Sequence, residues 1–274
     1  MFVFLYKGGF ETGEELAVAL KDKIKHFRPT RNLARVIRRR GVKPTDFLLR
    51  WGTTKNAELD SVFSRAGAKI LNSASAIEAN TNKLNSLVVF KSAGVPVPVF
   101  YKNKKDIRNF PVLGRKFNHK GGKDIIMISG SIDPLKNDYS KIPDRHFYTE
   151  FIPSEAEYRV HVFAGKVIRI TKKVFRGHDR FDKDISEKCV IRNDTYGWGH
   201  HALTDDELKL FSKDALDVCV RAVKAIGLDF GAVDLLIGKG RPYVLEVNSC
   251  PRLNSIGMEL YANSIKAILP RMYL

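Results

Sequence analysis

Short apolar runs alternate with helical patterns over the first 78 residues of the chain. Three buried strands are predicted, over Phe2 to Tyr6, Phe47 to Trp51 and Lys69 to Leu71. Residues Glu14 to Ile24 carry apolar side chains at helical spacing, and Asn32 to Arg40 have the same character. Strands that alternate with helices are typical of a parallel sheet. The pattern therefore predicts a small α/β unit over residues 1–78.

The rest of the chain is richer in strands. A helix is predicted over Leu84 to Ser92, and Gly94 ends it shortly before two prolines, which marks a boundary between units. Further strands are predicted over Val112 to Arg115, Ile125 to Ser129, Phe147 to Ile152, Tyr158 to Phe163 and Lys166 to Val174. One long helix is predicted over Asp205 to Ile226, because Thr204 and Glu207 form a capping box at its start.

A β-hairpin is predicted near the C-terminus, where two apolar runs flank the turn Gly238-Lys239-Gly240. Three polar residues, Asp234, Glu246 and Asn248, interrupt these runs. If the loop comprises Lys239 to Arg241, position 234 lies opposite position 246, and all three side chains share one face. Two carboxylates and an amide oxygen suit a hard cation such as Mg²⁺. The alternative is a half-buried hairpin whose polar residues lie on its solvent-exposed face.

Composition and charge indicate a globular protein with anionic partners. Of the 274 residues 44% are hydrophobic and 28% are charged, which fits a folded chain rather than a disordered one. The formal net charge of +17 favours nucleotides, nucleic acid or acidic substrates. An arginine cluster contributes to this charge, formed by Arg31, Arg35, Arg38, Arg39 and Arg40. Such a stripe is usually a solvated face, and a phosphate-rich macromolecule is the alternative partner.

Cysteine and histidine positions argue against a disulfide framework or a zinc site. The three cysteines, Cys189, Cys219 and Cys250, are odd in number and show no CxxC spacing, which is typical of a reducing compartment. His178, His200 and His201 lack metal-ligand spacing with a carboxylate or cysteine. No apolar run reaches membrane-spanning length, so we expect a cytoplasmic protein without membrane contact.

A series of motifs spans residues 80 to 257, namely Asn82-Lys83-Leu84, Ala93-Gly94-Val95-Pro96-Val97-Pro98, Pro111 to Arg115, Gly121 to Ile125, Tyr148 to Ile152, Glu157 to Phe163 and the Asp234/Glu246/Asn248 hairpin. With these motifs in order, this part of the chain resembles the ATP-grasp superfamily. The chain is most similar to carboxylate–amine ligases of the ribosomal-modification and glutathione-synthetase type, and also to small phage-borne members. The resemblance implies an α/β (α+β) fold with a pre-grasp unit at 1–78 and an ATP-grasp domain at 79–274. Within that domain it implies a central subdomain at 79–150 and a C-terminal subdomain at 151–274.

The resemblance also implies which residues bind the ATP phosphates. Lys83 and Arg115 take the positions that reach the α- and β-phosphates. At the position of Arg115 the family usually has a lysine. Arginine keeps the charge but offers a planar fork, and Lys116 is an alternative that strand alternation points to the other face. Lys120 to Lys123 is similar to the glycine loop that closes over the phosphates, and an ordinary hairpin tip is the alternative. Lys123 is the ATP-binding candidate in this loop.

Further site residues follow from the same resemblance. Glu150, Phe151 and Ile152 correspond to the hinge that contacts adenine, and Glu157 to a ribose contact. The cations expected around the γ-phosphate and the acceptor are Arg159, Lys172, Lys173, Arg176 and Arg192, with Lys172 assigned to ATP. The residues expected to take part in catalysis are Arg159, Arg192 and Asn193, and those expected to bind substrate are Arg176, Arg252 and Asn254.

The resemblance predicts an enzyme that uses ATP with Mg²⁺, or Mn²⁺ in its place, to join a carboxylate to an amine. In such ligases the carboxylate attacks the γ-phosphate to give an acyl phosphate, and the amine then displaces phosphate. The substrates are small molecules or peptides. An ATP-grasp kinase that phosphorylates a polar or polyanionic acceptor is one alternative. A nucleic-acid-binding protein with an ATP-responsive or degenerate site is another, although the sequence holds no specific nucleic-acid-binding motif. The sequence sets neither the substrates nor the oligomeric state.

Overall fold

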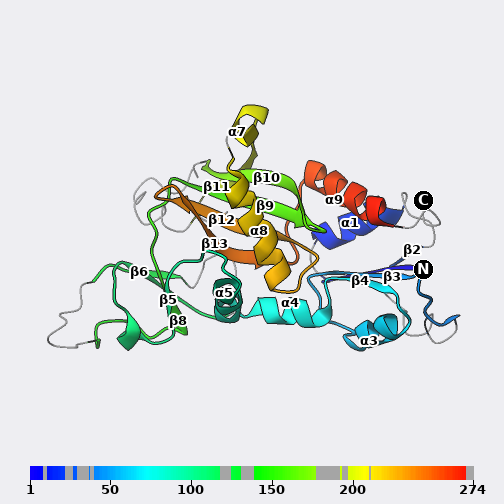
Figure 1. Ribbon diagram of the computed structural model, residues 1–274, viewed down its shortest axis with the longest axis horizontal. Helices are drawn as coiled ribbons and strands as arrows, with labels where there is room; N and C mark the ends of the chain where they lie inside the picture. The colour runs from blue at the N-terminus through cyan, green and yellow to red at the C-terminus, as the bar shows by residue number, and fades with distance from the viewer. Residues whose placement is uncertain are drawn as a thin grey trace.

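Three sheets and the helices around them form the molecule (Figure 1). The computed structural model describes residues 1–8, 11–21, 27–29, 37, 40–117, 125–130, 139–176, 192, 197–209 and 211–269. In Figure 1 the N-terminal sheet and the small central sheet lie toward opposite ends of the long axis, and the five-stranded sheet lies between and above them. No helix in the described part of the chain is long and apolar enough to cross a membrane.

The N-terminal sheet is fully parallel, as the sequence predicts. Its order is β2-β1-β3-β4, and its strands are β1 (Phe2–Tyr6), β2 (Phe27–Pro29), β3 (Phe47–Trp51) and β4 (Lys69–Leu71). The helices of this region are α1 (Glu11–Lys21), α3 (Glu58–Arg65) and α4 (Ala74–Thr81). Helix α1 begins at Glu11 rather than Glu14. The helix expected over residues 32–40, with most of the arginine cluster, lies largely outside the described residues.

A small antiparallel sheet forms the central region. Its order is β5-β8-β6-β7, with β5 (Phe100–Tyr101), β6 (Val112–Arg115), β7 (Ile126–Ile128) and β8 (Phe147–Glu150). Helix α5 (Lys83–Ser92) precedes it and begins where the Asn82 side chain accepts from the Asn85 N–H. A 3₁₀ turn, η1 (Lys104–Asp106), follows β5. The sheet has its own apolar cluster, formed by Tyr101, Ile107, Val112, Ile142 and Tyr148.

The five-stranded antiparallel sheet carries most of the chemistry predicted above. Its order is β11-β10-β9-β12-β13, with β9 (Ala156–Phe163), β10 (Lys166–Phe175), β11 (Trp198–Ala202), β12 (Phe230–Gly238) and β13 (Arg241–Asn248). Helix α8 (Lys213–Ala225) packs against one of its faces, and α9 (Ser255–Ile268) lies beside α1.

The long helix predicted over Asp205 to Ile226 is wrong, because the chain forms two helices there. These are α7 (Asp205–Lys209) and α8 (Lys213–Ala225). The predicted capping box is confirmed, since Thr204 N donates to Glu207 Oε2 at 2.9 Å and Glu207 N to Thr204 Oγ1 at 3.3 Å. A second cap starts α8, where the Ser212 side chain accepts from the Ala215 N–H. Serine favours this role over a helix interior, which explains the break.

In the hairpin of β12 and β13, Asp234 and Glu246 pair as predicted, but the turn is shorter than predicted. Its turn has two residues, Lys239 and Gly240, both at positive φ, as tight antiparallel hairpins require. A two-residue turn alone would place position 245 opposite Asp234. A bulge between Asp234 and Leu235 shifts the register, so that Asp234 pairs with Glu246. The predicted facing of these two residues is confirmed, although the three-residue loop is not.

The N-terminal sheet shares one apolar core with the five-stranded sheet. Trp51 of β3 stacks on Phe230 at 5.2 Å between ring centroids and meets Tyr261 of α9 edge-on at 5.1 Å. Asn72, after β4, accepts from the N–H groups of Asp229 and Phe230 and donates to the Phe230 carbonyl. These contacts join the two sheets directly.

Candidate active site on the five-stranded sheet

Alternate side chains of the five-stranded sheet form two different faces. The cross-strand pairs Asp234–Arg159 and Arg159–Thr171 fix which residues share a face. We call one side the polar face, which comprises Glu157, Arg159, His161, Thr171, Lys173, His200, Asp234, Glu246 and Asn248. We call the other side the apolar face, where Val160, Val162, Ile170, Val233, Leu235, Val244 and Val247 belong to the core beneath α8.

An ion pair between the half-buried Arg159 and the buried Asp234 lies at the centre of the polar face. Arg159 Nε donates to Asp234 Oδ1 at 2.8 Å, and Nη2 donates to Oδ2 at 3.0 Å. Burial alone would raise the pKa of Asp234, but the charges of Arg159 and Lys173 outweigh it and hold that pKa well below its usual range. Asp234 is therefore an ionised carboxylate held by a bidentate arginine fork.

Lys173 lies between two carboxylates. Its Nζ donates to Glu157 and, at 2.9 Å, to the Arg192 carbonyl, and it lies 3.9 Å from Asp234 Oδ2. Burial opposes the charge of Lys173, but the charges of Asp234 and Glu157 raise its pKa. The pKa of Glu157 is also raised, chiefly by burial, although Lys173 opposes that shift. Lys173 is therefore a charged amine inside the site.

The neighbouring Lys172 does not join this cluster, contrary to its assignment to the ATP site. Lys172 pairs with Tyr158 and His201, which places it on the opposite side of the sheet from Lys173. Lys172 is the lysine assigned to ATP from the sequence, whereas Lys173 is the one that reaches the charged cluster. A bulge between Val167 and Arg169 shifts the register of β10, and this shift places Lys173 rather than Lys172 on the polar face.

Two more cations reach the polar face from the central region. Lys83 Nζ lies 2.6 Å from Glu246 Oε2. Burial would raise the pKa of Glu246, but Lys83 lowers it to about 2. Burial lowers the pKa of Arg115, and the charges of Glu246 and Glu157 oppose that shift, so Arg115 faces the same carboxylates. Lys116 is exposed instead, which favours Arg115 over Lys116.

The hinge residues Glu150, Phe151 and Ile152 join the central sheet to β9. The Glu150 carboxylate accepts from Tyr101 Oη at 2.5 Å and from Asn109 Nδ2 at 2.8 Å. The N–H groups of Glu150 and Phe151 donate to the carbonyls of Val99 and Pro111. Within the described part of the chain, the N–H of Ile152 has no hydrogen-bond partner, so it can donate to a planar ring such as adenine.

The remaining predicted residues lie around the margin of the polar face. The Arg192 guanidinium lies 5.0 Å over the Trp198 ring, and its Nη2 donates to the Ser154 carbonyl at 3.2 Å. Arg176 is exposed, and its Nη2 donates to the His200 carbonyl at 2.6 Å. Asn193 and Lys123, together with the glycine loop Lys120 to Lys123, lie outside the described residues.

Asn254 and Cys250 have structural contacts after the hairpin. Asn254 Oδ1 accepts from the Gly257 N–H at 3.0 Å and from Arg169 Nη1 at 2.6 Å, so this predicted substrate residue caps α9. Cys250 packs against Gly52, where an added Cβ would lie 2.3 Å from the Cys250 Cβ. Burial raises the pKa of the Cys250 thiol to about 11, which fits a packing role rather than that of a nucleophile. Arg252 is exposed beside them.

The donor set of the polar face fits a hard cation and an anionic ligand together. Asp234 and Glu246 supply ionised carboxylates, and Asn248 donates to Glu246 Oε1 through Nδ2 at 3.2 Å, which leaves its amide oxygen for a cation. No group of three His, Cys, Asp or Glu side chains suited to a metal occurs among the described residues. Among the described residues, Lys83, Arg115, Arg159 and Lys173 lie near the carboxylates of Glu157, Asp234 and Glu246, and the charge of Arg192 also acts on Glu157. This concentration of positive charge favours an anion.

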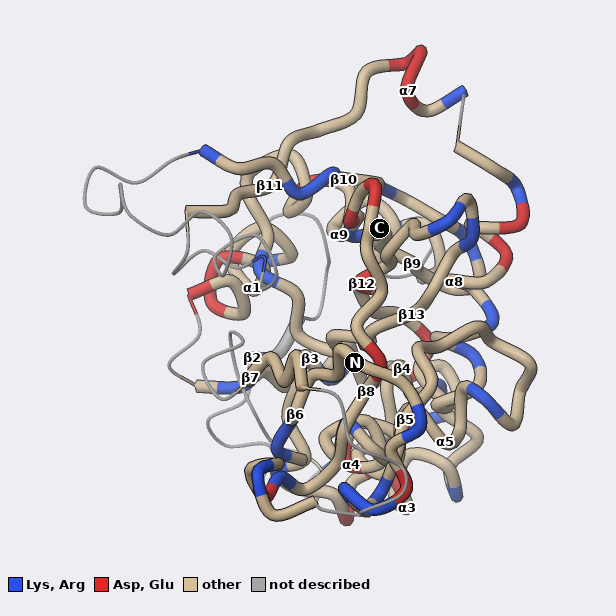
Figure 2. Tube along the Cα trace, turned by 90° about the vertical axis from the view of Figure 1, so that its left-hand side faces the viewer, with Lys and Arg blue, Asp and Glu red and all other residues tan. Residues whose placement is uncertain are grey.

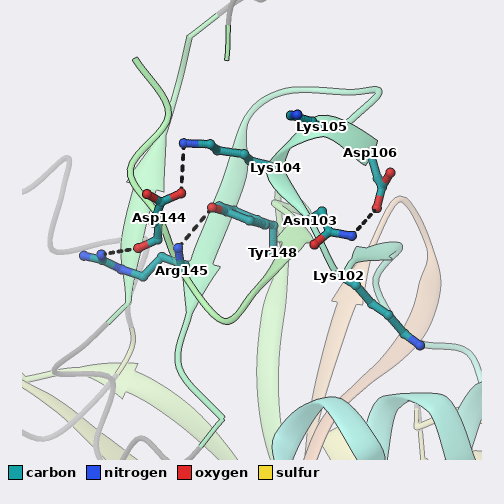
Figure 3. A pocket seen from close by; sticks show the side chains of 8 residues that line it. All are labelled: Lys102, Asn103, Lys104, Lys105, Asp106, Asp144, Arg145 and Tyr148. Carbon is teal, nitrogen blue, oxygen red and sulfur yellow. Dashed lines mark hydrogen bonds and ion pairs between the residues drawn. The ribbon is translucent and has the colours of Figure 1, made fainter. Parts of the chain in front are cut away.

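A cavity of about 410 Å³ on the central region is separate from this site (Figure 3). It is lined by Lys102, Asn103, Lys104, Lys105, Asp106, Asp144, Arg145 and Tyr148. Lys104 pairs with Asp144 at 2.8 Å, and Asp106 accepts from Asn103 at 3.2 Å. None of these residues belongs to the polar face. Figure 2 shows that Lys and Arg are spread over many elements, so the lysines around this cavity do not distinguish it from the rest of the protein.

Comparisons with known proteins show what the chain is similar to. Residues 203–272 match the model of the RimK-like ATP-grasp domain. A probable alpha-L-glutamate ligase of Haemophilus influenzae (strain PittEE) is 26% identical over 242 residues, which cover 81% of this chain and 75% of that protein. Solved structures that resemble the chain include D-alanine–D-alanine ligase of Bacillus anthracis, with 16% identity and a TM-score of 0.62 over 97% of this chain and 92% of the other. The ATP-grasp ligase PsnB, complexed with minimal precursor, Mg and ADP, has 16% identity and a TM-score of 0.64 over 97% and 96%. The predicted ATP-grasp fold is confirmed.

Proposed function

We propose that this chain, an ATP-grasp protein related to carboxylate–amine ligases, uses ATP to activate a carboxylate as an acyl phosphate and then joins it to an amine. One observation carries the proposal. The polar face gathers two ionised carboxylates, an amide oxygen and four buried or half-buried cations, which come from both the central region and the five-stranded sheet. A triphosphate with its metal needs this combination of charges.

The residues of the site divide into three groups in this proposal. Lys83 and Arg115 bind the phosphates from the central side, and Lys173 binds them from the sheet. The hinge binds adenine through the Ile152 N–H, and Glu157 lies at the ribose end. Asp234, Glu246 and Asn248 would hold Mg²⁺, or Mn²⁺ in its place, which neutralises phosphate charge and orients the phosphates when bound.

Binding of the nucleotide and metal would exchange partners within the site. Lys83 now neutralises Glu246, and Arg159 neutralises Asp234. Phosphate oxygens would then pair with Lys83, while Asp234 and Glu246 would bind the cation. The internal ion pairs therefore hold the side chains near their working positions before the ligand arrives.

The chemistry then needs positioning and positive charge more than covalent catalysis. The substrate carboxylate attacks the γ-phosphate, giving the acyl phosphate and ADP, and the amine displaces phosphate through a tetrahedral intermediate. Arg159 and Arg192, with Asn193 beside the latter, are the residues we assign to the anions that develop in these two steps. Removal of one such donor is expected to cost about 3 kcal/mol of barrier.

We further propose L-glutamate as one of the two substrates. The relative from Haemophilus influenzae is named a probable alpha-L-glutamate ligase, and the chain carries a net charge of +17, which suits an acidic substrate. Arg176 and Arg252 are exposed beside the polar face and are the residues we assign to substrate carboxylates.

The test measures ADP and orthophosphate release with ATP, Mg²⁺ and L-glutamate, with and without a peptide whose free C-terminus offers a carboxylate. A second tube contains hydroxylamine, which traps an acyl phosphate as a hydroxamate. Release that requires both an acid and an amine, with hydroxamate in the trap, supports the ligase. A phosphorylated product that forms without any amine would instead identify a kinase. Tight, salt-sensitive nucleic-acid binding without turnover would contradict both.

A further inference from the structure

Alternate side chains of strand β8 lie on opposite faces of the central sheet. Phe147 pairs with Arg115, whose guanidinium lies 5.7 Å from the centroid of the Phe147 ring, so this side of the sheet faces the candidate nucleotide site. Tyr148 and Glu150 lie on the other side, which we call the far face, and Tyr148 belongs there to the apolar cluster of this sheet. The carboxylate of the hinge residue Glu150 therefore points away from the side that carries Arg115.

Two donors hold this carboxylate on the far face. Tyr101 Oη donates to Glu150 Oε1 at 2.5 Å, and Asn109 Nδ2 donates to the same oxygen at 2.8 Å. Tyr101 is buried, and burial together with the charge of Glu150 raises the pKa of its phenol, so the hydroxyl keeps its proton and donates it. Both hydrogen bonds go to an ionised acceptor, which makes them stronger than bonds between neutral groups.

The hinge is also tied to the same part of the central region through its backbone. The Glu150 N–H donates to the Val99 carbonyl at 2.8 Å, and the Phe151 N–H donates to the Pro111 carbonyl at 2.9 Å. Val99 and Pro111 flank the segment that carries the two side-chain donors. One segment therefore holds the end of β8 through two backbone bonds and two side-chain bonds.

The other end of the hinge packs against the five-stranded sheet. A Cβ added to Gly238 of β12 would lie 2.6 Å from Ile152 Cγ2 and 2.8 Å from the Pro153 carbonyl oxygen, so the hinge lies directly on the backbone of β12. The Glu155 N–H donates to the Ile237 carbonyl at 2.9 Å. The Ile152 N–H, which is the donor assigned to adenine, therefore lies between two anchored points.

We propose that Tyr101 and Asn109 are positioning residues for adenine recognition. They act through the Glu150 carboxylate, which fixes the hinge and with it the Ile152 N–H. The proposal rests on the nucleotide site of the proposed function. A binding group works only if it is held within about 0.5 Å of its productive position, and these hydrogen bonds supply that support from the far face. Glu150 is then a positioning residue itself and makes no contact with the base through its carboxylate.

The first experiment measures the Kd of ATP and of tripolyphosphate, each with Mg²⁺, by calorimetry on wild type and variants. Tripolyphosphate carries the phosphate charges without a base, so the ratio of the two Kd values isolates adenine recognition. Tyr101→Phe should raise the Kd of ATP about tenfold, which is the scale of one hydrogen bond to a charged group, and should leave that of tripolyphosphate unchanged. Asn109→Ala, at an exposed position, should raise the Kd of ATP by less.

Tyr148→Phe is the matched control, because it removes a phenol hydroxyl from the same face of the same sheet. The Tyr148 hydroxyl donates to the Pro143 carbonyl at 2.8 Å and accepts from the Arg145 N–H at 3.1 Å, and neither bond involves Glu150. This variant should lose stability without any change in the ratio of the two Kd values. It therefore separates a general loss of stability from a loss of positioning.

A mutant cycle tests whether Glu150 acts through these hydrogen bonds. Glu150→Gln keeps an accepting oxygen and should retain most of the preference for ATP over tripolyphosphate. Glu150→Ala should lose that preference as Tyr101→Phe does, and the double variant should show no further loss. Additive losses would overturn the proposal, because they would show that Glu150 contacts adenine independently of Tyr101.

A second measurement needs no nucleotide. Amide hydrogen exchange of the Phe151 N–H, which donates to the Pro111 carbonyl, should be faster in Tyr101→Phe than in wild type and unchanged in Tyr148→Phe. Equal exchange in all three proteins would contradict the support that Tyr101 gives to the hinge.

The calorimetric outcomes separate this proposal from the proposed function. An unchanged ratio of Kd values in Tyr101→Phe, or an equal change in Tyr148→Phe, would overturn the positioning role and leave the nucleotide site in place. If wild type bound neither ATP nor tripolyphosphate, the proposed function itself would fail, and the positioning role with it.

Discussion

The two faces of the five-stranded sheet are built from neighbouring residues and yet have opposite chemistry. On the apolar face Val160, Val233 and Leu235 are fully buried beneath α8. On the polar face the residues next to them, Arg159 and Asp234, form an ion pair in which the carboxylate is buried and the arginine is half-buried. Because successive side chains of a strand point to opposite sides, one residue separates core from candidate chemistry.

The comparison teaches that position along the chain is a poor guide to a role on this sheet. Lys172 and Lys173 are adjacent, as are His200 and His201, but only the second lysine and the first histidine reach the charged cluster. Substitutions on the apolar face should therefore change stability alone, whereas those on the polar face should change stability and ligand binding together.

The largest effect is expected from Asp234→Ala. The change leaves the half-buried Arg159 without its carboxylate partner and removes a negative charge that lies 3.9 Å from Lys173 Nζ. Breaking a buried ion pair from one side typically costs about 3–5 kcal/mol. Urea unfolding should show that loss, and Mg²⁺-dependent ATP binding should disappear with it. An unfolding free energy equal to that of wild type would contradict the role given to this pair.

Leu235→Ala tests the other face at the next residue. The truncated side chain is fully buried, so the free energy of unfolding should fall by about 2–5 kcal/mol. ATP with Mg²⁺ should still raise the melting temperature of this variant by as much as it does for wild type. A lost nucleotide response here would show that the two faces are not independent.

Acid should weaken the polar face through Glu246. Its pKa is about 2 in the folded protein, below its ordinary value of 4.5, so its ion pair with Lys83 stabilises the fold fully above pH 4.5. That contribution is lost as the pH falls from 4.5 toward 2, because the unfolded chain binds the proton near pH 4.5 and the folded protein binds it only at about pH 2. Urea unfolding of Glu246→Gln between pH 7 and pH 3 should show a flatter profile than wild type. Parallel profiles would contradict the assignment.

The smallest effect is expected from Lys172→Met, which is matched to Lys173→Met. Lys172 lies on the side away from the cluster, so its loss should change the free energy of unfolding by about 0.5 kcal/mol or less. ATP binding, followed by a calorimetric titration, should be unchanged. Lys173→Met should bind ATP weakly, since it removes the amine between Glu157 and Asp234. Equal affinities in the two variants would remove Lys173 from the nucleotide site.

Much of this architecture could be predicted where the residue pattern is local. The bounds of β1, β3, β4 and β6 agree with the predicted strands, because each is a short apolar run between clear breaks. The facing of Asp234 and Glu246 was also predicted, but a two-residue turn and a bulge compensate each other to produce it. A bulge leaves no simple sequence signal, so this agreement was partly fortuitous.

The features that the sequence did not predict are of two kinds. In some, two local signals in the sequence compete, and in others the contact joins residues that are distant in the sequence. Ser212 caps α8 and thereby interrupts the predicted long helix. The sequence does not reveal this cap, because the apolar period of the helix continues through Phe211. Helix α4 was not predicted, and the expected boundary at residue 78 falls inside it. The pairing of Lys83 with Glu246 joins residues far apart in the chain, and no sequence period contains that information. The assignments of Asn193 and Lys123 stay predictions.

The most direct test of the central claim is a thermal-shift titration with ATP, with and without Mg²⁺, on wild type, Glu246→Gln and the apolar-face variant Leu235→Ala. A ligand at a hundredfold excess over its Kd stabilises the native state by about 2.7 kcal/mol. We predict that Mg²⁺ with ATP raises the melting temperature of wild type and Leu235→Ala, and that Glu246→Gln loses the Mg²⁺-dependent part. An unchanged response in Glu246→Gln, or no shift in wild type under any condition, would contradict the assignment of the polar face as the nucleotide and metal site.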